Sequence, residues 1–134
     1  MIDIDYENRY VYHITCEREL QEEVVKFLNT TDLMFSCSHT DGMLNTPERR
    51  NEARMMGYRK GLPDIIIYTP CSNFNGLALE IKAPWGTGEL KEHQEEILNE
   101  FSDKNNYYVL VSNNLVKIVE TITKYRLNSL MTIS

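Results

Sequence analysis

The chain lacks the features that define several large classes of protein. Its three cysteines, Cys16, Cys37 and Cys71, are widely spaced and include no C-x-x-C pair, which argues against a disulfide framework and favours a reducing, intracellular compartment. No apolar run approaches the length of a membrane span, and the acidic N-terminal residues do not resemble a secretory signal peptide. A Walker A motif and a dinucleotide-binding glycine motif are also absent. We therefore expect an intracellular protein with no membrane partner, in either the cytoplasm or the nucleus.

An overall excess of positive charge is absent as well. The formal net charge is -6, whereas proteins that bind a polyanion usually gather Lys and Arg. The basic residues are nevertheless uneven, because one short segment contains Arg49, Arg50, Arg54, Arg59 and Lys60. Arginine suits bidentate phosphate contacts, so we predict that this segment binds DNA phosphates. The alternative is a solvated helix whose arginines pair with Glu48 and Glu52.

The remaining composition predicts one α/β domain over residues 1–134. Hydrophobic residues make up 42% and charged residues 25% of the chain, and no repeat or Pro/Gly/Ser linker divides it. Hydrophobic periodicity predicts helices over 17–29, 48–57 and 89–101, a last helix from 115 capped by Asn113 or Asn114, and strands over 33–37, 64–68, 77–82 and 107–111. Thr15 is the expected N-cap of the first helix. The coarse order is helix, three strands, helix, strand, helix.

The segment 77–82 carries the most informative pattern. Leu77, Leu79 and Ile81 alternate with Ala78, Glu80 and Lys82, a period of two that sends the aliphatic side chains to one face of a strand. Glu80 and Lys82 then share the other face. The preceding strand, which begins at Asp64, is continuously apolar, so the polar face of its neighbour is expected to line a cleft.

These residues suit phosphodiester hydrolysis, which needs an activated water, neutralised phosphate charge and a stabilised leaving oxygen. A divalent cation meets all three needs, and Mg2+ usually takes one or two carboxylates as ligands. Asp64 and Glu80 are the predicted metal ligands, with the carbonyl of Ile81 as a further one. Lys82 is placed to orient the attacking water. Taken singly, Asp after Pro is a common turn and Glu-x-Lys is a common solvated strand edge.

Two further polar residues lie beside predicted apolar faces. Glu17 and Gln21 are one helical turn apart and flank the apolar stripe of the first helix, so both can point toward the cleft. Gln94 interrupts the apolar face of the helix 89–101. We predict that Glu17 and Gln94 belong to the catalytic set. The alternatives are a solvated helix flank for Glu17 and a satisfied core or boundary amide for Gln94.

The ordered motifs resemble the VRR-NUC family of the PD-(D/E)XK nuclease superfamily. Glu17-x-x-x-Gln21, Gly61-Leu62-Pro63-Asp64, Glu80-Ile81-Lys82 and a later helix with Gln94 match the family pattern of virus-type replication-repair nucleases. The resemblance implies a restriction-endonuclease-like core with a mixed central sheet flanked by helices, in the order α-β-β-β-α-β. It also implies a Mg2+-dependent or Mn2+-dependent endonuclease of viral origin that acts as a homodimer on branched DNA, such as four-way (Holliday) junctions, in repair.

Several alternatives remain open. A flap-directed nuclease uses the same chemistry, and a DNA-binding module of the same fold uses none. His13-x-x-Cys16 and Cys37-x-His39 invite a zinc site, although burial of Cys16 and Cys37 beside apolar positions explains the thiols as well. Trp85, in the turn after Lys82, is suited either to stacking on an unpaired base or to capping the core.

Overall fold

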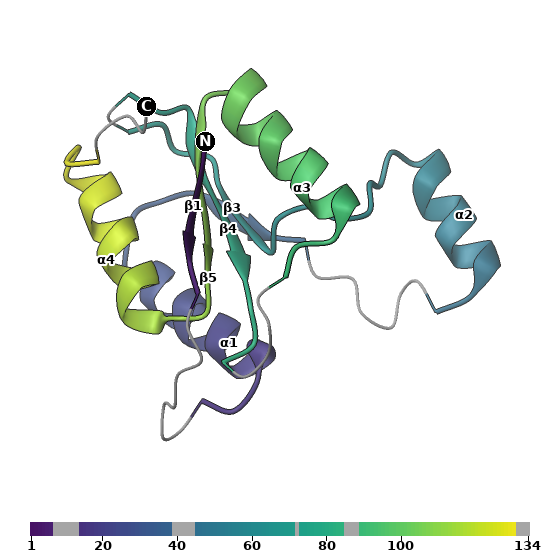
Figure 1. Cartoon of the computed structure of the whole chain (residues 1–134), viewed down its shortest axis with the longest axis horizontal. Coiled ribbons are helices and arrows are strands. Elements are labelled where there is room, and N and C mark those ends of the chain that lie inside the picture. Colours follow the sequence, from purple (N-terminus) through teal and green to yellow (C-terminus); the bar gives the residue numbers. More distant parts are fainter. Residues whose placement is uncertain (7–13, 39–44, 72, 85–88, 131–134) are drawn as a thin grey trace.

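A mixed five-stranded sheet, in the order β1-β5-β4-β3-β2, organises the chain (Figure 1). The computed structural model describes residues 1–134 apart from 7–13, 39–44, 72, 85–88 and 131–134. The strands are β1 (Ile2–Asp5), β2 (Phe35–Cys37), β3 (Ile65–Ile67), β4 (Gly76–Ile81) and β5 (Tyr107–Ser112). β1, β5 and β4 run parallel, whereas β3 is antiparallel to both of its neighbours.

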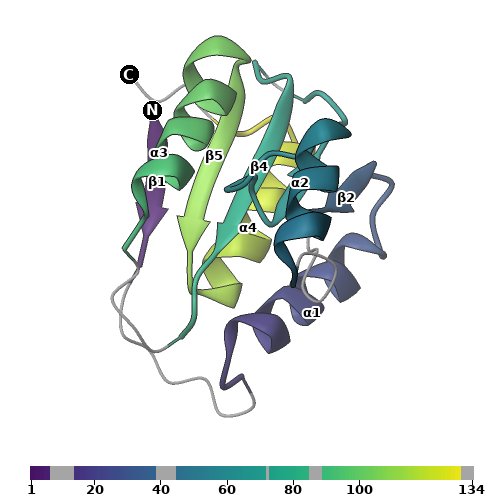
Figure 2. The same ribbon diagram turned by 90° about the vertical axis from the view of Figure 1, so that its right-hand side faces the viewer.

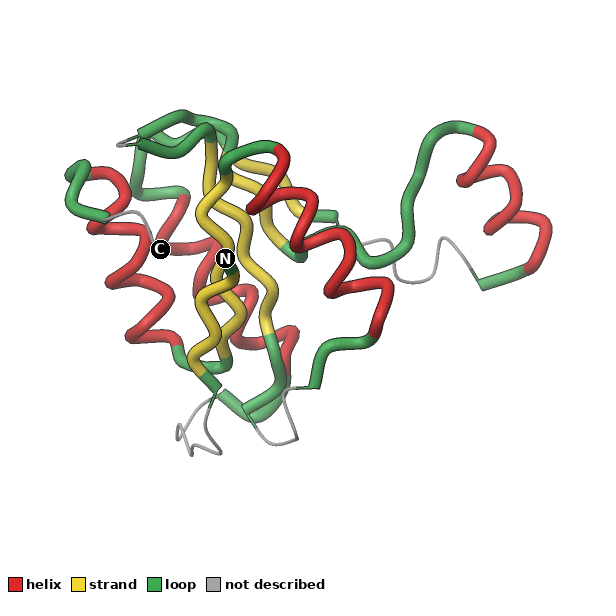
Figure 3. The backbone as a smooth tube through the Cα atoms, turned by 45° about the horizontal axis from the view of Figure 1, so that its top comes forward, coloured by secondary structure: helices red, strands yellow, loops and turns green. Residues whose placement is uncertain are grey.

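Helices cover both faces of the sheet. They are α1 (Glu17–Leu28), α2 (Pro47–Met55), α3 (Glu92–Asn99), which continues into the π-turn η1 (Glu100–Lys104), and α4 (Leu115–Arg126). α1 and α4 lie on one face and α3 lies on the other (Figure 2). α2 buries none of its residues and projects away from the sheet (Figure 3). None of the helices described has the length and apolar character needed to cross a bilayer.

The alternating pattern of β4 is confirmed by two separate apolar clusters. Leu77, Leu79 and Ile81 belong to the large cluster beneath α1 and α4. Ala78 belongs to the smaller cluster that includes Leu98 of α3. Since side chains alternate along a strand, Glu80 follows Ala78 on the α3 face. The sheet therefore carries a carboxylate on the face that has the smaller apolar core.

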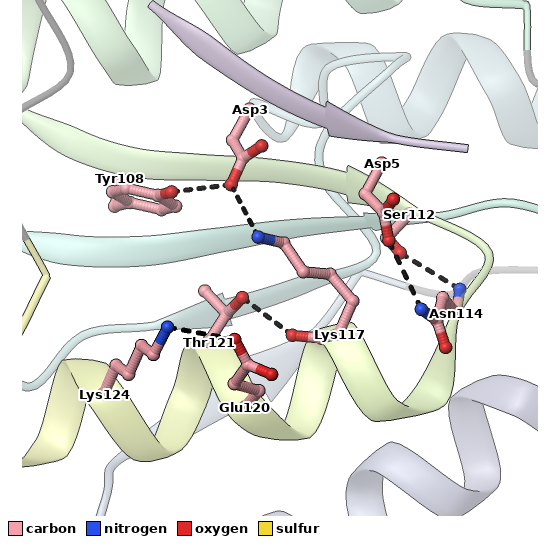
Figure 4. Close-up of polar contacts among 9 residues, drawn as sticks. All are labelled: Asp3, Asp5, Tyr108, Ser112, Asn114, Lys117, Glu120, Thr121 and Lys124. Carbon is pink, nitrogen blue, oxygen red and sulfur yellow. Dashed lines mark hydrogen bonds and ion pairs between the residues drawn. The ribbon is translucent and has the colours of Figure 1, made fainter. Parts of the chain in front are cut away.

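The sequence analysis missed the edge strand β1. Its Ile-Asp-Ile-Asp alternation pairs in parallel with Val109 to Ser112 of β5. Asp3 ties the strand to the body, because its Oδ2 accepts a 2.6 Å hydrogen bond from the Tyr108 hydroxyl and lies 3.6 Å from the Lys117 ammonium (Figure 4). The acidic residues that argued against a signal peptide thus help to hold a strand.

The helix ends also differ in detail from the prediction. The N-cap of α1 is Cys16 rather than Thr15, because the Thr15 hydroxyl turns to donate a 2.8 Å hydrogen bond to Glu19. α3 begins at Glu92, three residues later than expected. Asn114 is confirmed as the cap of α4, since its side chain accepts the Val116 N–H at 3.1 Å. At α1, the predicted cap was wrong because the Thr15 side chain has another partner in Glu19.

Candidate active site

A pocket of about 270 Å³ lies at the C-terminal end of β4. The antiparallel register of β3 and β4 pairs Ile65 with Leu79, so Asp64 and Glu80 follow as the next pair. α1 reaches the pocket with its first residue, Glu17. All the predicted catalytic side chains line this pocket, together with others from the loop before β3 and from the start of α3. The lining comprises Glu17, Ser38, Tyr58, Lys60, Gly61, Leu62, Asp64, Glu80, Lys82, Lys91, His93 and Gln94.

Glu80 is the most buried charged residue of the pocket, with 5% of its surface exposed. Burial raises the pKa of Glu80 to about 9, and the Asp64 carboxylate acts in the same direction. Lys82 opposes the shift, while a hydrogen bond with Asp64 and the charge of Glu17 add to it. Three carboxyl groups thus share one partly enclosed space, an arrangement that a bound cation would stabilise.

Asp64 is held by backbone contacts on both sides. Its Oδ2 accepts the Ile81 N–H at 2.7 Å, which ties the carboxylate to the end of β4. The Ser38 N–H donates to the Asp64 carbonyl at 3.0 Å, and the Ser38 hydroxyl donates to the Pro63 carbonyl at 2.5 Å. The loop after β2 therefore fixes the backbone from which Asp64 projects.

Gln94 joins the catalytic side chains into one network. Its Nε2 donates to Glu80 Oε2 at 3.1 Å, and its Oε1 accepts the backbone N–H of Lys91 at 3.1 Å. The Lys82 ammonium lies 3.5 Å from Gln94 Oε1 and 3.8 Å from Glu80 Oε2. Gln94 is thus a satisfied boundary amide and also a neighbour of the reactive groups, so the two readings of this residue are compatible.

The donor set fits a hard divalent cation that keeps several waters. Within the residues that the structure describes, no group of three or more His, Cys, Asp or Glu side chains is close enough to form a full protein cage for a metal. Mg2+ does not need such a cage, since it is commonly held by one or two carboxylates. Asp64 and Glu80 offer these oxygens, and Ile81 ends β4 directly beside them.

The predicted basic segment divides into three parts. Arg49, Arg50 and Arg54 lie on α2 with exposed side chains. Arg59 instead forms a bidentate pair with Glu100, at 2.8 and 3.2 Å, so it is already engaged within the protein. Lys60 lines the pocket. One segment of sequence therefore supplies an exposed helix, an internal ion pair and a pocket residue.

Sequence reasoning missed Ser38, Tyr58, Lys91 and His93 as pocket residues. Lys91 and His93 flank the start of α3 within three positions of Gln94, and this proximity was the available signal. Ser38 and Tyr58 lie in loops, where residue type alone predicts no contact.

The remaining predictions from the sequence concern the cysteines, a zinc site and Trp85. The expected burial of Cys16 and Cys37 is wrong, because both thiols are exposed. Cys37 is the last residue of β2, which is an edge strand of the sheet formed by the described residues. His13, His39 and Trp85 lie outside the described residues, so the zinc site and the stacking role stay predictions.

Comparison with known proteins reveals the same architecture elsewhere. A solved structure described as "VRR_NUC domain protein" superposes with a TM-score of 0.67 over 88% of this chain and 97% of that chain, at 18% sequence identity. The chain has the VRR-NUC fold. This finding confirms the restriction-endonuclease-like fold class that the motifs predicted. No family model and no curated protein matches the sequence. At this level of identity, the VRR-NUC likeness concerns the fold.

Proposed function

We propose that the chain is a metal-dependent endonuclease that hydrolyses phosphodiester bonds in DNA. The observation that carries the proposal is the convergence of Asp64, Glu80 and Lys82 in one pocket, where Gln94 contacts both Glu80 and Lys82. The VRR-NUC fold supports it, since this is the fold that the sequence motifs predicted. Fold alone does not determine function, which depends on the residues of the site.

The proposed metal ligands are Asp64, Glu80, the carbonyl of Ile81 and Glu17, either directly or through water. Bound Mg2+, or Mn2+ in its place, supplies Lewis acidity and a lowered pKa for a water molecule. In the hydrolysis, the attacking water gives up a proton and its oxygen bonds to phosphorus, while the bond between phosphorus and the leaving sugar oxygen breaks and that sugar oxygen gains a proton. The Lys82 ammonium orients the attacking water and offsets charge on the phosphate. Gln94 fixes the Glu80 carboxylate and limits the freedom of Lys82.

We further propose branched DNA as the substrate, with a four-way junction as the first candidate and a flap as the alternative. A homodimer would suit two symmetrical cuts across a junction. Arg49, Arg50 and Arg54 support this substrate because they lie on α2, which projects away from the sheet, where a second part of a large DNA molecule would lie. Such contacts position the DNA without reading its sequence.

The test is cleavage of end-labelled four-way junction, flap, duplex and single-stranded DNA with Mg2+, Mn2+ or EDTA. We expect metal-dependent cleavage that falls by at least about 100-fold in Glu80→Ala and Lys82→Ala. Glu120→Ala and Lys124→Ala are matched controls, because these two exposed residues of α4 pair with one another (Figure 4).

Symmetrical cuts in the junction would support the resolvase-like activity, whereas cuts confined to flaps would keep the chemistry and change the substrate. Tight DNA binding with no cleavage of any substrate would overturn the proposal in favour of a non-catalytic binding module.

A further inference from the structure

The charges of the pocket are of both signs, and the proposed reaction uses only some of them. Glu17, Asp64 and Glu80 provide the acidic side, and Lys82 is assigned to the reacting phosphate. Three further basic groups, Lys60, Lys91 and His93, line the same pocket and have no part in that chemistry. Among the described residues, Lys60 and His93 have no side-chain hydrogen bond or ion pair, and Lys91 has no ion pair.

Close packing between two segments brings these groups together. Gly61 has a φ of +89°, and a Cβ built on it would lie 2.8 Å from His93 Cδ2 and 3.3 Å from the His93 carbonyl oxygen. Lys60 directly precedes this glycine, and Lys91 directly precedes the first residue of α3. The absence of a side chain at Gly61 therefore allows Lys60 to approach the beginning of α3.

The start of α3 also favours an anion at this position. Gln94 takes the N–H of Lys91, whereas the N–H groups of the first helical turn have no carbonyl partner within the helix. The positive end of the helix dipole adds to the charge of the two lysines. Glu92 and Glu95 oppose this field, but both are exposed and neither lines the pocket.

We propose that Lys60, Lys91 and His93 bind a second phosphate of the DNA strand, next to the phosphate that is cut. The inference rests on the proposed nuclease function and extends it, since it assigns the basic side of the pocket to the neighbouring linkage. Single point charges such as Lys suit a phosphate, and the histidine ring adds a hydrogen-bond donor. A pocket of about 270 Å³ has room for a short piece of one strand.

The experiment measures binding of a fluorescent single-stranded oligonucleotide to Glu80→Gln protein with Mg2+ present, so that the DNA stays intact. Lys60→Ala, Lys91→Ala and His93→Ala are introduced singly into that background, with Lys124→Ala as the matched surface control. We expect each lysine variant to weaken binding about three- to tenfold and to reduce the salt slope by about one, with a smaller effect for His93→Ala. Lys124→Ala is expected to change neither quantity.

A set of oligonucleotides then identifies the phosphate that is bound. Each linkage flanking the mapped cut site is replaced in turn by an uncharged methylphosphonate. One such replacement is expected to weaken binding to the parent protein as much as Lys91→Ala does, and to cause no further loss in that variant. Additive losses at both flanking linkages would overturn the subsite.

The subsite and the nuclease function can fail separately. If the wild-type protein cuts DNA but the lysine variants bind like Lys124→Ala, the subsite is wrong and the nuclease function stands. If no DNA is cut while Lys60→Ala and Lys91→Ala still weaken binding selectively, the nuclease function is wrong and the phosphate site stands.

Discussion

The two faces of the sheet differ in how much apolar surface they bury. The face under α1 and α4 carries a large cluster that includes Leu77, Leu110 and Tyr125, all fully buried. The α3 face carries a small cluster of Ala78, Leu98, Val109 and Val111. Beyond that small cluster the same face carries Glu80, which lines the pocket.

One face of β4 therefore contributes to the stability of the fold, and the opposite face contributes to the pocket. β4 contributes Leu79 and Ile81 to the large cluster and Glu80 to the pocket, in strict alternation. The buried aliphatic neighbours offset the unfavourable burial of a carboxylate, because apolar burial is the main stabilising contribution in a domain of this kind. β4, which carries Glu80, is therefore also a fully buried strand.

Truncating one leucine on each face tests directly whether the two faces have different roles. Leu110→Ala is expected to destabilise the fold by about 2–5 kcal/mol while the cleavage rate per folded molecule stays unchanged. Leu98→Ala, on the α3 face, is expected to lose less stability but also to lower the cleavage rate, since Leu98 lies one helical turn after Gln94. Urea unfolding and cleavage assays on both variants provide the measurement. Equal effects of the two substitutions on cleavage would contradict the division of roles.

Alanine substitutions at Gly61 and Gly57 distinguish the effect of backbone strain from the effect of contact with a pocket residue. Both have positive φ, +89° and +97°, so alanine at either position is expected to cost about 1 kcal/mol for strain. Only Gly61 has neighbours there, because the space around Gly57 is open to 4 Å. Gly61→Ala is therefore expected to destabilise more and to weaken DNA binding, as measured by thermal unfolding and anisotropy.

A double variant measures how much of the stability lost in Gly61→Ala is due to contact with His93. His93→Ala removes the ring atom that a Cβ at Gly61 would meet at 2.8 Å, so it should recover part of the stability lost in Gly61→Ala. The same substitution beside Gly57→Ala should recover nothing. An identical loss in the two glycine variants would show that the packing against α3 has no effect.

Much of the architecture and of the acidic side of the site was predictable from local patterns. The alternation of residues 77–82 placed Glu80 opposite the aliphatic core, and Asp64 preceded a continuously apolar strand that pairs with it. These features depend on neighbours in sequence, where period and turn chemistry determine geometry. β1 was missed because four alternating residues at an edge carry little periodic signal.

Apart from Lys60, which was predicted to bind DNA, the basic side of the pocket was not predictable, because it depends on contacts between distant segments. Arg59 belongs to the same basic run as Lys60, yet it pairs with Glu100 while Lys60 faces the pocket. His93 becomes a pocket residue only because Gly61 packs against it. The sequence shows that a segment contains several basic residues, but tertiary packing determines which partner each of them contacts.

The comparison between the two faces also predicts a pH dependence of stability. The pKa of Glu80 is about 9 in the folded protein, far above its ordinary value of 4.5, so between these pH values the folded chain holds a proton that the unfolded chain releases. Below pH 4.5 both states are protonated, and stability then falls as the pH rises toward 9, by at most about 1.4 kcal/mol per pH unit. Glu80→Gln removes this titration and keeps the side-chain shape.

In EDTA, Glu80→Gln protein should therefore unfold at a higher temperature than the wild-type protein. The difference in unfolding temperature should form a margin that grows between pH 5 and pH 9. About 1 kcal/mol corresponds to about 4 °C for a chain of this size. Mg2+ should narrow the margin, because a cation bound by Asp64 and Glu80 stabilises the ionised wild-type site and has weaker ligands in the variant. Thermal unfolding across this pH range, with and without Mg2+, checks both effects, and Glu120→Gln on exposed α4 is the matched control. A pH-independent margin that Mg2+ leaves unchanged would mean that the Glu80 carboxyl neither titrates in this range nor binds the cation.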